Sequence, residues 1–473
     1  MKAARAAQPG TLAYVAGLAG AKLETVGVRP ADAGRRRVHG ACIDTRGLKK
    51  GQVFVALRGE RADGHDFADR ALGAGACAAL VRAAWIEAQR ERLLPGAALL
   101  AADDPQAALQ RWARAHRAGF DIPLVAVTGS NGKTTVRAML AHVLAARGPV
   151  LASEGNLNNH LGVPLTLLRL EPRHRMAVVE MGMSHPGEIA ALCGIAAPTA
   201  GVITNAGRAH LEGLGTVEAV ARAKSELVDY LERRGGTAVL NADNEALMAA
   251  NRGRVSRVRT FGVDAPADVR AVNVAARGLG GSTFRLEGGP EVRLQVPGLH
   301  NVRNALAAIA AAGALGVPAA EAAAALAGFR RLEHGRLELA HAGGVQILDD
   351  TYNANPDSLA AAVEVLLHTP ARGRRMLALG DMLELGGDAA KEHERAGRGL
   401  TGLDVVWAAG AHAPDVARGA REAGVAEAHA FEDVGAMVRA LPERLRRGDL
   451  LLVKGSRGMR METLVEALKA RLA

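Results

Sequence analysis

Aromatic residues are scarce in this sequence, which has 7 Phe, 3 Trp and 3 Tyr among 473 residues. A hydrophobic core must therefore be built mainly from Ala, Leu and Val, whose small volumes favour close packing of helices on sheets. Cysteine is scarcer still, with only Cys42, Cys77 and Cys193 in the sequence. These three residues lie far apart and have no CxxC spacing. This pattern argues against a disulfide framework or a zinc site and fits a reducing cytosol, so we expect a cytoplasmic protein.

Long apolar runs are also missing. Residues 12–21 are weakly apolar, but Lys22 and Glu24 follow without a convincing cleavage site, which predicts a packed first helix rather than a signal peptide. The Ala-rich stretch 305–328 is interrupted by two glycines and a proline, so neither side is long enough to span a bilayer. We therefore expect no insertion into a membrane.

The charge is basic, with 59 Lys and Arg against 49 Asp and Glu and a formal net charge of +10. A nucleic-acid partner would fit this excess, but no basic stripe with interleaved aromatic residues supports one. Anionic small substrates explain the excess equally well. We expect no nucleic-acid partner and take a monomer as the default state.

The length predicts about three domains. Residues 1–105 alternate short strands and helices, which indicates a small α/β unit. Residues 106–335 have a stronger strand-helix rhythm, typical of a parallel sheet with helices on both faces, and residues 336–473 form a third, Rossmann-like α/β series. The apolar runs that carry this prediction are residues 124–127, 176–179, 201–204, 345–348, 376–379, 405–408 and 450–453.

A glycine-rich segment follows the apolar run 124–127 and leads into a predicted helix. Its glycines let backbone N–H groups turn toward phosphate oxygens, Lys133 supplies positive charge, and the Thr134 hydroxyl can bind magnesium. The spacing departs from the general P-loop, which has a glycine five positions before the second glycine. In this sequence Val127 occupies that position before Gly132. A chance turn would not explain the preceding strand and the following Lys-Thr-Thr. The segment predicts nucleotide binding by Gly129, Ser130, Asn131, Gly132, Lys133, Thr134 and Thr135.

Two further residues follow strands of the same predicted sheet. Glu180 ends the run 176–179, at the edge where the phosphate loop lies, and would supply a magnesium ligand there. A structural salt bridge is the simpler alternative. His210 follows the run 201–204 at the same edge, although an isolated loop histidine is more often only a hydrogen-bonding group.

Lys224 occupies a position of an otherwise apolar helical stripe in the helix that begins near Thr216. Extension of its amine to solvent is the usual outcome for such a lysine. Burial would instead disfavour the charged form and leave a nucleophilic amine that can add carbon dioxide. The hypothesis is a carbamate that acts as a carboxylate.

The segment 128–135, together with Glu180, His210, Lys224 and the sequence His-Asn-Val-Arg-Asn at 300–304, strongly resembles the Mur ligases and their folylpolyglutamate synthase relatives. The resemblance covers nearly the whole chain. It implies that Lys224 is carbamylated and helps to hold Mg²⁺, and that Glu180 and His210 bind the metal. It also implies that Asn304 contacts adenine, and that the third domain brings Arg336 and Asp350 to the nucleotide through a hinge near residue 335.

Three segments of the third domain look like the signatures of the family members that add D-alanyl-D-alanine: Asp-Asp-Thr-Tyr-Asn-Ala-Asn-Pro at 349–356, Gly-Asp-Met-Leu-Glu-Leu-Gly at 380–386 and Lys-Gly-Ser-Arg at 454–457. The DNPR motif of the diaminopimelate-adding members is absent from the sequence. Read without the family, these segments would be a turn, a strand end and a solvated basic edge at 454–460.

Residues 155–164 match the muramoyl-substrate loop of the family, with His160 where an acid is more frequent. Residues 44–46 and 63–65 resemble its uridine-nucleotide-binding region, with Thr45 where serine is common. The substrate residues implied by the resemblance are Thr45, Arg46, Asn156, Asn158, Asn159, Ser184, Tyr352, Asn353 and Asn355.

These resemblances imply a ligase that uses ATP and Mg²⁺ to join D-alanyl-D-alanine to UDP-N-acetylmuramoyl-tripeptide. The carboxylate would first be activated as an acyl phosphate, with Lys133, His210 and Lys224 as catalytic residues. A folate-polyglutamating ligase is the second hypothesis, disfavoured by the uridine-type first domain. A non-catalytic P-loop nucleotide-binding module is the third.

Overall fold

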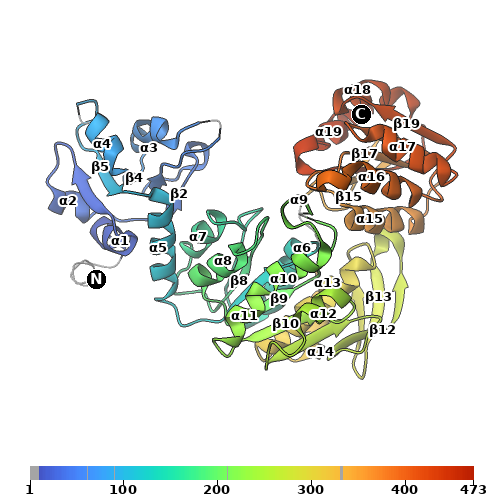
Figure 1. The fold of residues 1–473 in the computed structure, drawn as a ribbon, viewed down its shortest axis with the longest axis horizontal. Coiled ribbons are helices and arrows are strands. Elements are labelled where there is room, and N and C mark those ends of the chain that lie inside the picture. Colours follow the sequence, from blue (N-terminus) through green and yellow to red (C-terminus); the bar gives the residue numbers. More distant parts are fainter. Residues whose placement is uncertain (1–9, 61, 90, 210, 331–333, 473) are drawn as a thin grey trace. The chain divides into compact units, whose positions relative to one another are not determined.

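The computed structural model describes residues 10–60, 62–89, 91–209, 211–330 and 334–472 (Figure 1). They form two compact units, each of which is described by itself. Unit 1 consists of residues 1–124, 148–182 and 190–198, and unit 2 consists of residues 125–147, 183–189 and 199–473. The strands belong to three sheets with five, nine and six strands, and helices connect most of them.

The first sheet lies in unit 1 and has the strand order β1-β5-β4-β3-β2. Only β1 is antiparallel to its neighbour. The strands are β1 (Lys22–Thr25), β2 (Ala41–Cys42), β3 (Val53–Val55), β4 (Ala78–Arg82) and β5 (Ala98–Ala102), and the helices are α1 (Leu12–Ala19), α2 (Pro30–Gly34), α3 (Ala68–Gly73), α4 (Ala83–Gln89) and α5 (Pro105–Arg117). The prediction of a packed first helix is confirmed, because α1 buries four of its residues and Gly20 caps its C-terminal end.

The second sheet has the order β14-β13-β12-β11-β10-β9-β6-β8-β7. Its strands are β6 (Leu124–Thr128), β7 (Val150–Ala152), β8 (Met176–Glu180), β9 (Ala200–Ile203), β10 (Thr237–Asn241), β11 (Val258–Gly262), β12 (Val269–Ala276), β13 (Ser282–Leu286) and β14 (Glu291–Leu294). The predicted parallel arrangement is confirmed for β6, β9, β10, β11 and β12 in unit 2 and for β7 and β8 in unit 1. The pairs β12–β13 and β13–β14 are antiparallel, an extension that the sequence analysis does not predict.

The helices that accompany these strands are α6 (Lys133–Leu144), α7 (Gly162–Leu167), α8 (Glu188–Ala196), α9 (Leu211–Leu214), α10 (Val217–Lys224), α11 (Glu226–Glu232), α12 (Glu245–Asn251), α13 (His300–Ala314) and α14 (Ala319–Leu326). Helix α13 contacts α6 and strands β9 to β12, and the residues that it buries are mostly alanines. Small side chains let the helix approach the sheet closely. The core is therefore dense without many aromatic rings, as the composition predicts.

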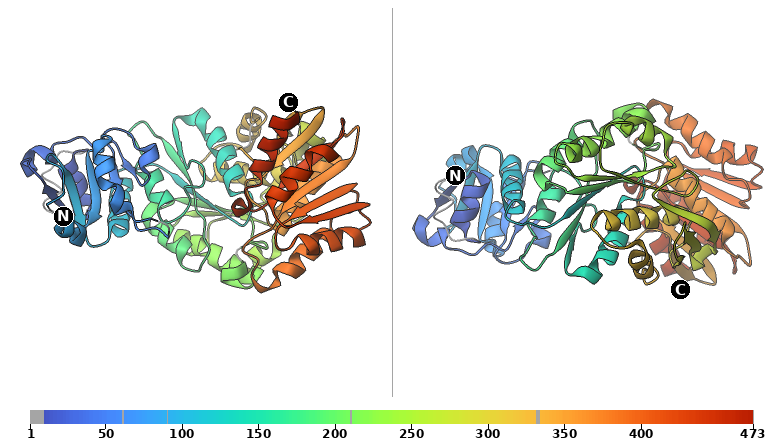
Figure 2. Two further views of the ribbon diagram at one scale, coloured as in Figure 1. Left: turned by 90° about the horizontal axis from the view of Figure 1, so that it is seen from above. Right: turned by 90° about the horizontal axis from the view of Figure 1, so that it is seen from below.

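The third sheet lies in unit 2, with the order β15-β16-β20-β17-β18-β19 and only β15 antiparallel. Its strands are β15 (Glu338–Ala342), β16 (Val345–Asp350), β17 (Arg375–Gly380), β18 (Val405–Ala409), β19 (Glu427–Phe431) and β20 (Leu450–Lys454), and its helices are α15 (Pro356–His368), α16 (Ala389–Arg398), α17 (Ala413–Glu422), α18 (Val434–Ala440) and α19 (Glu462–Leu472). Successive strand residues point to opposite faces. Leu377 packs with α15 to α17 and Met376 with α18 and α19, so helices cover both faces (Figure 2).

Across the described residues, no helix combines the length and the apolar character needed to cross a membrane.

Candidate nucleotide-binding site

The phosphate loop connects β6 to α6. Its glycines have backbone conformations that other residues rarely adopt, with φ of 149° at Gly129 and 81° at Gly132. A side chain would also have no room at either position, because a Cβ atom on Gly129 would overlap the Thr204 hydroxyl and one on Gly132 would overlap the Asn304 amide oxygen. The loop conformation therefore depends on glycine at both positions.

A short segment after β9 supports the phosphate loop. The Asn205 carbonyl accepts a hydrogen bond from Ser130 N (3.0 Å), and its side-chain Oδ1 accepts one from Asn131 N (2.9 Å). The Thr204 hydroxyl donates to Asn131 O at 2.5 Å, and Gly207 N donates to Ser130 Oγ at 2.9 Å. Four hydrogen bonds thus fix the loop to residues 204–207, so a displacement of that segment would be transmitted to the loop.

Two lysines lie near this loop. Lys133 Nζ donates to the carbonyl oxygens of Gly129 (2.8 Å) and Ser130 (3.3 Å). Lys224, the last residue of α10, is only 1% exposed, so its predicted inward orientation is confirmed and extension to solvent is excluded. Burial, reinforced by the charge of Lys133, holds the pKa of the Lys224 amine well below its usual value. Among the described residues, no carboxylate pairs with Lys224.

The helix predicted to begin near Thr216 is interrupted directly after Lys224. Helix α10 ends at Lys224 and α11 begins at Glu226, with Ser225 between them. The Ser225 hydroxyl donates to the Ala221 carbonyl at 2.8 Å and accepts from Asn251 Nδ2 at 2.8 Å. Side-chain bonding to a carbonyl one turn earlier competes with the regular helical pattern, which accounts for the short interruption.

Helix α13 brings Asn304 to the phosphate loop, where its amide oxygen lies against Gly132. Asn304 Nδ2 donates to Asn301 Oδ1 at 2.8 Å, and Asn301 Nδ2 donates to the Pro297 carbonyl at 2.7 Å, so the side chain is held in place. His300 begins the same helix. Burial, with smaller effects from the charges of Lys454 and Arg303, lowers the pKa of His300 to about 4, which keeps the ring neutral at physiological pH.

The ends of β16 and β20 bring together an acid and a base. Asp350 and Lys454 are partners in the parallel register, and Lys454 Nζ donates to Asp350 Oδ2 at 2.5 Å and to the Asn353 carbonyl at 2.8 Å. Burial raises the pKa of Asp350, and the nearby positive charges of Lys454 and Arg336 oppose that shift. Lys454 is 2% exposed, so the alternative of a solvated basic edge is wrong for this residue.

Arg336 reaches the phosphate loop from the segment before β15. Its Nη2 donates to Thr134 Oγ1 at 2.9 Å, and its guanidinium lies 4.1 Å from the centroid of the Tyr352 ring, a cation–π contact. Arg336 Nε is buried and has no hydrogen-bond partner among the described residues. The side chain therefore places a positive charge beside the hydroxyl predicted to bind magnesium.

We expect that Arg336→Ala raises the KM for ATP by roughly tenfold, because a charged donor beside the phosphate loop is lost. Steady-state kinetics with ATP as the varied substrate would measure this effect. An unchanged KM for ATP would remove Arg336 from the nucleotide site.

Asn355 has a structural task that the sequence analysis does not predict. It caps α15, where its side chain accepts from Ser358 N and the Ser358 hydroxyl completes the capping box. Asn355 Nδ2 also donates to Asn131 Oδ1 at 2.8 Å, and Asn131 Nδ2 donates back to Asn355 Oδ1 at 3.3 Å. Two hydrogen bonds thereby join the start of α15 to the phosphate loop. Asn353, two residues earlier, accepts from Arg457 N at 3.4 Å.

Glu180 lies in unit 1, at the end of β8, and is 2% exposed. Asn158 Nδ2 donates to Glu180 Oε1 at 2.8 Å, and Ser153 Oγ accepts from Glu180 N at 3.0 Å. The predicted substrate loop is thus joined to the predicted metal ligand. Asn159 instead orders the turn before α7, where its Oδ1 accepts from Leu161 N (3.1 Å) and Gly162 N (2.9 Å).

The other predicted substrate residues of the first two predicted domains are Asn156, Ser184, Thr45 and Arg46. Asn156 contributes its carbonyl oxygen to a hydrogen bond from Asn158 N at 2.7 Å, whereas Ser184 N, in unit 2, donates to Glu188 Oε2 at 2.6 Å. Thr45 lies in a short 3-10 turn (Thr45–Gly47). Within that turn Arg46 donates to Asp44, whose pKa falls to about 2 because of these hydrogen bonds.

The structure shows the surroundings of His65 but does not describe His210. His65 is 4% exposed, accepts at Nε2 from Arg82 N (3.0 Å), and therefore donates from Nδ1 to Asp63 (2.6 Å). This structural arrangement accounts for the Asp-Gly-His segment. His210, predicted as a metal ligand and catalytic residue, lies outside the described residues.

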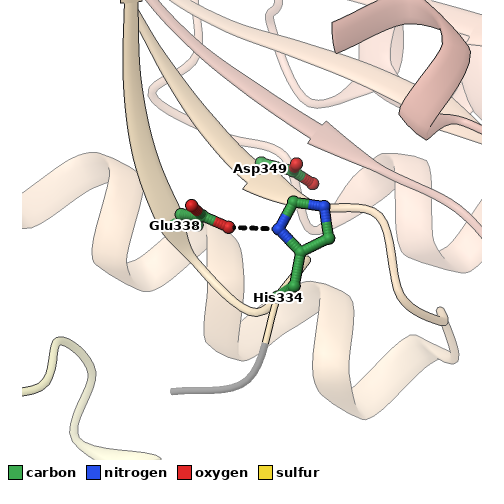
Figure 3. Close-up of side chains that lie close together, drawn as sticks. All are labelled: His334, Glu338 and Asp349. Carbon is green, nitrogen blue, oxygen red and sulfur yellow. Dashed lines mark hydrogen bonds and ion pairs between the residues drawn. The ribbon is translucent and has the colours of Figure 1, made fainter. Parts of the chain in front are cut away.

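His334, Glu338 and Asp349 form a cluster that the sequence analysis does not predict (Figure 3). Glu338 and Asp349 are opposite each other in the β15–β16 register, and His334 Nδ1 lies 2.6 Å from Glu338 Oε2. The contact between His334 and Glu338 brackets Arg336 in the sequence.

Three family models match the chain: the Mur ligase family catalytic domain at residues 37–117, the Mur ligase middle domain at 127–312, and the Mur ligase glutamate ligase domain at 335–457. The UDP-N-acetylmuramoyl-tripeptide--D-alanyl-D-alanine ligase of Bacillus subtilis is 36% identical over 441 residues, covering 91% of this chain and 93% of that protein. The ligase of the same name from Escherichia coli is 38% identical over 437 residues, covering 90% and 92%.

Solved structures agree with the sequence relatives. The crystal structure of MurF from Acinetobacter baumannii has a TM-score of 0.84 and 31% identity, covering 98% of this chain and 100% of that one. The MurF ligase of Thermotoga maritima, solved in complex with ADP, has a TM-score of 0.77 and 29% identity, covering 92% and 97%. The predicted three-domain α/β fold is thereby confirmed. The chain belongs to the Mur ligase family.

Proposed function

We propose that this protein is an ATP-dependent ligase that joins D-alanyl-D-alanine to UDP-N-acetylmuramoyl-tripeptide and produces the UDP-muramoyl-pentapeptide, ADP and phosphate. The observation that carries this proposal is the similarity, over nine-tenths of both chains, to ligases of that name. The site supports it, because the phosphate loop contacts Arg336 and Asn355, two residues that the family resemblance assigns to the nucleotide and the acceptor.

Each predicted domain receives a role in this proposal. Residues 1–105 bind the uridine nucleotide, residues 106–335 bind ATP, and residues 336–473 bind D-alanyl-D-alanine and complete the nucleotide site. Asn304 contacts adenine, and Arg336 and Asp350 contact the rest of the nucleotide. The substrate contacts come from Thr45, Arg46, Asn156, Asn158, Asn159, Ser184, Tyr352, Asn353 and Asn355. We propose a cytoplasmic monomer.

The reaction begins when the terminal carboxylate of the tripeptide attacks the γ-phosphorus of ATP. An acyl phosphate forms and ADP leaves, and the amine of D-alanyl-D-alanine then attacks the acyl carbon and displaces phosphate. Both reactants of the first step are anionic, so Lys133 offsets their repulsion from its position on the phosphate loop. The protein positions the reactants and needs no covalent enzyme intermediate.

We propose that the nucleotide site of this chain holds a magnesium ion. Hydroxyl and carboxylate oxygens are ligands that Mg²⁺ prefers, and we propose Thr134, Glu180, His210 and a carbamate on Lys224 as the residues that hold it. Buried Lys224 has its pKa lowered, so its neutral amine can add carbon dioxide. Bound Mg²⁺ would neutralise charge on the phosphate oxygens during transfer.

The decisive experiment is phosphate release from ATP with UDP-muramoyl-tripeptide, in the presence and absence of D-alanyl-D-alanine, with the product identified by mass. Release that requires both substrates, together with a pentapeptide product, would establish the proposal. Activity on folate and glutamate instead would assign the chain to the folylpolyglutamate synthase relatives. Hydrolysis that needs no acceptor would indicate a nucleotide-binding module.

A further inference from the structure

Arg208 follows the segment that supports the phosphate loop, and its side chain and backbone converge on one carboxylate. Arg208 N donates to Asp357 Oδ2 at 3.0 Å, and its Nε and Nη2 donate to Asp357 Oδ1 at 3.1 and 2.8 Å. Its remaining terminal nitrogen, Nη1, lies 3.2 Å from Glu392 Oε2 on α16. Arg208 alone therefore binds both the first turn of α15 and α16.

The contact is more extensive than an ordinary surface ion pair, because Asp357 accepts three hydrogen bonds from one residue. Asp357 Oδ2 lies so near the Gly207 backbone that a Cβ atom there would be 2.5 Å from it. The Arg208 and Asp357 side chains are 29% and 37% exposed. A charged pair with three donors from one residue and partial burial is better ordered than two flexible side chains that meet in water.

A second fastening lies beside the first. Asn355, two residues before Asp357, exchanges hydrogen bonds with Asn131 of the phosphate loop. Arg208 is joined to the same loop through Gly207, whose N–H donates to Ser130 Oγ. The first turn of α15 is thus attached at two points to a single assembly of phosphate loop and supporting segment.

The attached turn directly follows the residues that the proposed function assigns to nucleotide and acceptor. Asp350, Tyr352 and Asn353 precede α15 in the chain, and the Tyr352 ring carries the guanidinium that donates to Thr134. We propose that Arg208 and Asp357 are positioning residues of the ligation reaction: their ion pair holds the start of α15 so that Arg336 and Asp350 face the phosphate loop. This inference rests on the proposed function and assigns a role to residues outside its nucleotide contacts.

The proposal predicts an effect on nucleotide affinity rather than on the chemical step. Loss of the pair lowers the fraction of molecules in which the third-sheet residues stand at the loop, and the apparent affinity falls by that fraction. Saturating ATP restores the arrangement, so kcat changes little. We expect Arg208→Asp and Asp357→Arg each to weaken ADP binding and to raise the KM for ATP by roughly tenfold.

The test is a charge-swap cycle in the full-length protein, with ADP affinity measured by calorimetry and the KM for ATP measured in parallel. The double variant Arg208→Asp/Asp357→Arg should recover much of the affinity that either single variant loses. The matched control is Arg254→Ala, which removes an ion pair with Asp229 away from the loop. Arg254 Nη2 lies 2.8 Å from each carboxylate oxygen of Asp229. The Arg254 and Asp229 side chains are 41% and 35% exposed, similar to the Arg208 and Asp357 side chains.

The possible outcomes separate the two proposals. Recovery in the double variant, with unaltered ADP affinity in Arg254→Ala, supports the positioning role. Unchanged ADP affinity in the single variants, or a double variant that merely adds their losses, would overturn it. Because ADP binding needs no acceptor peptide, this readout remains informative even if the ligation assay fails.

Discussion

Lys224→Met should lower kcat for ligation by about 10²–10³-fold and at the same time stabilise the folded protein at neutral pH. Loss of the amine removes the only group at this position that can become a carbamate, and removal of one preorganised electrostatic group from an active site costs about 10²–10³ in kcat. Methionine has a similar length and carries no charge to bury. Activity is measured as phosphate release in the presence of Mg²⁺. Stability is measured separately, as the thermal midpoint in bicarbonate-free buffer without Mg²⁺.

The stability gain should depend on pH in a defined direction. Burial and Lys133 lower the folded-state pKa of Lys224, whereas the unfolded value is about 10.4. Between these two values the unfolded chain binds more protons, so the stability of the wild-type protein rises with pH. The advantage of Lys224→Met is therefore complete below the folded pKa and vanishes near pH ~10.4.

Two controls make this prediction specific. Lys224→Ala leaves space in which a small carboxylate such as acetate can replace the carbamate, so added carboxylate should restore part of the activity. Arg222→Ala changes an exposed residue of the same helix and should leave stability and activity near the wild-type values. A Lys224→Met protein with normal turnover would exclude a catalytic role for a carbamate at this position, and a lower midpoint at neutral pH would contradict the burial argument.

Local sequence was sufficient to predict the phosphate loop and the direction of Lys224. The loop requires glycines with positive φ next to a strand end, and this requirement appears within eight consecutive residues. The inward direction of Lys224 follows from helical periodicity, which places it among apolar neighbours. The strand positions of the third sheet were predictable for the same reason, because each buried strand is a short apolar run between polar turns.

Contacts between distant segments could not be predicted in this way. The ion pair of Arg208 with Asp357 joins residues 149 positions apart, and neither residue belongs to a motif. Asn159 and Asn355 were assigned to substrate because of their motifs. The Asn159 side chain also accepts from Gly162 N in the turn before α7, and Asn355 caps α15, uses that depend on the local backbone. The antiparallel β13–β14 pair had a local signal, because Gly288, Gly289 and Pro290 separate two alternating segments.

Gly132→Ala should cause the second large loss, through geometry alone. An alanine with φ near 81° is strained by about 1–2 kcal/mol. Its methyl group would also overlap Asn304 Oδ1, and overpacking of a fixed neighbour costs about 1–3 kcal/mol. Asn304 cannot withdraw freely because Asn301 holds its amide nitrogen. We expect a lower thermal midpoint and a KM for ATP raised by about tenfold or more.

Gly253→Ala separates strain from overlap in this experiment. Gly253 has φ of 71° and no atom within 4 Å of an added Cβ, so this variant carries only the backbone strain. Its midpoint should fall slightly while its KM for ATP stays at the wild-type value. If Gly132→Ala behaved like Gly253→Ala in ATP binding, the close approach of Asn304 to the phosphate loop would have no part in nucleotide recognition. If only Gly132→Ala lost affinity, the packing of α13 against the loop would be part of the nucleotide site.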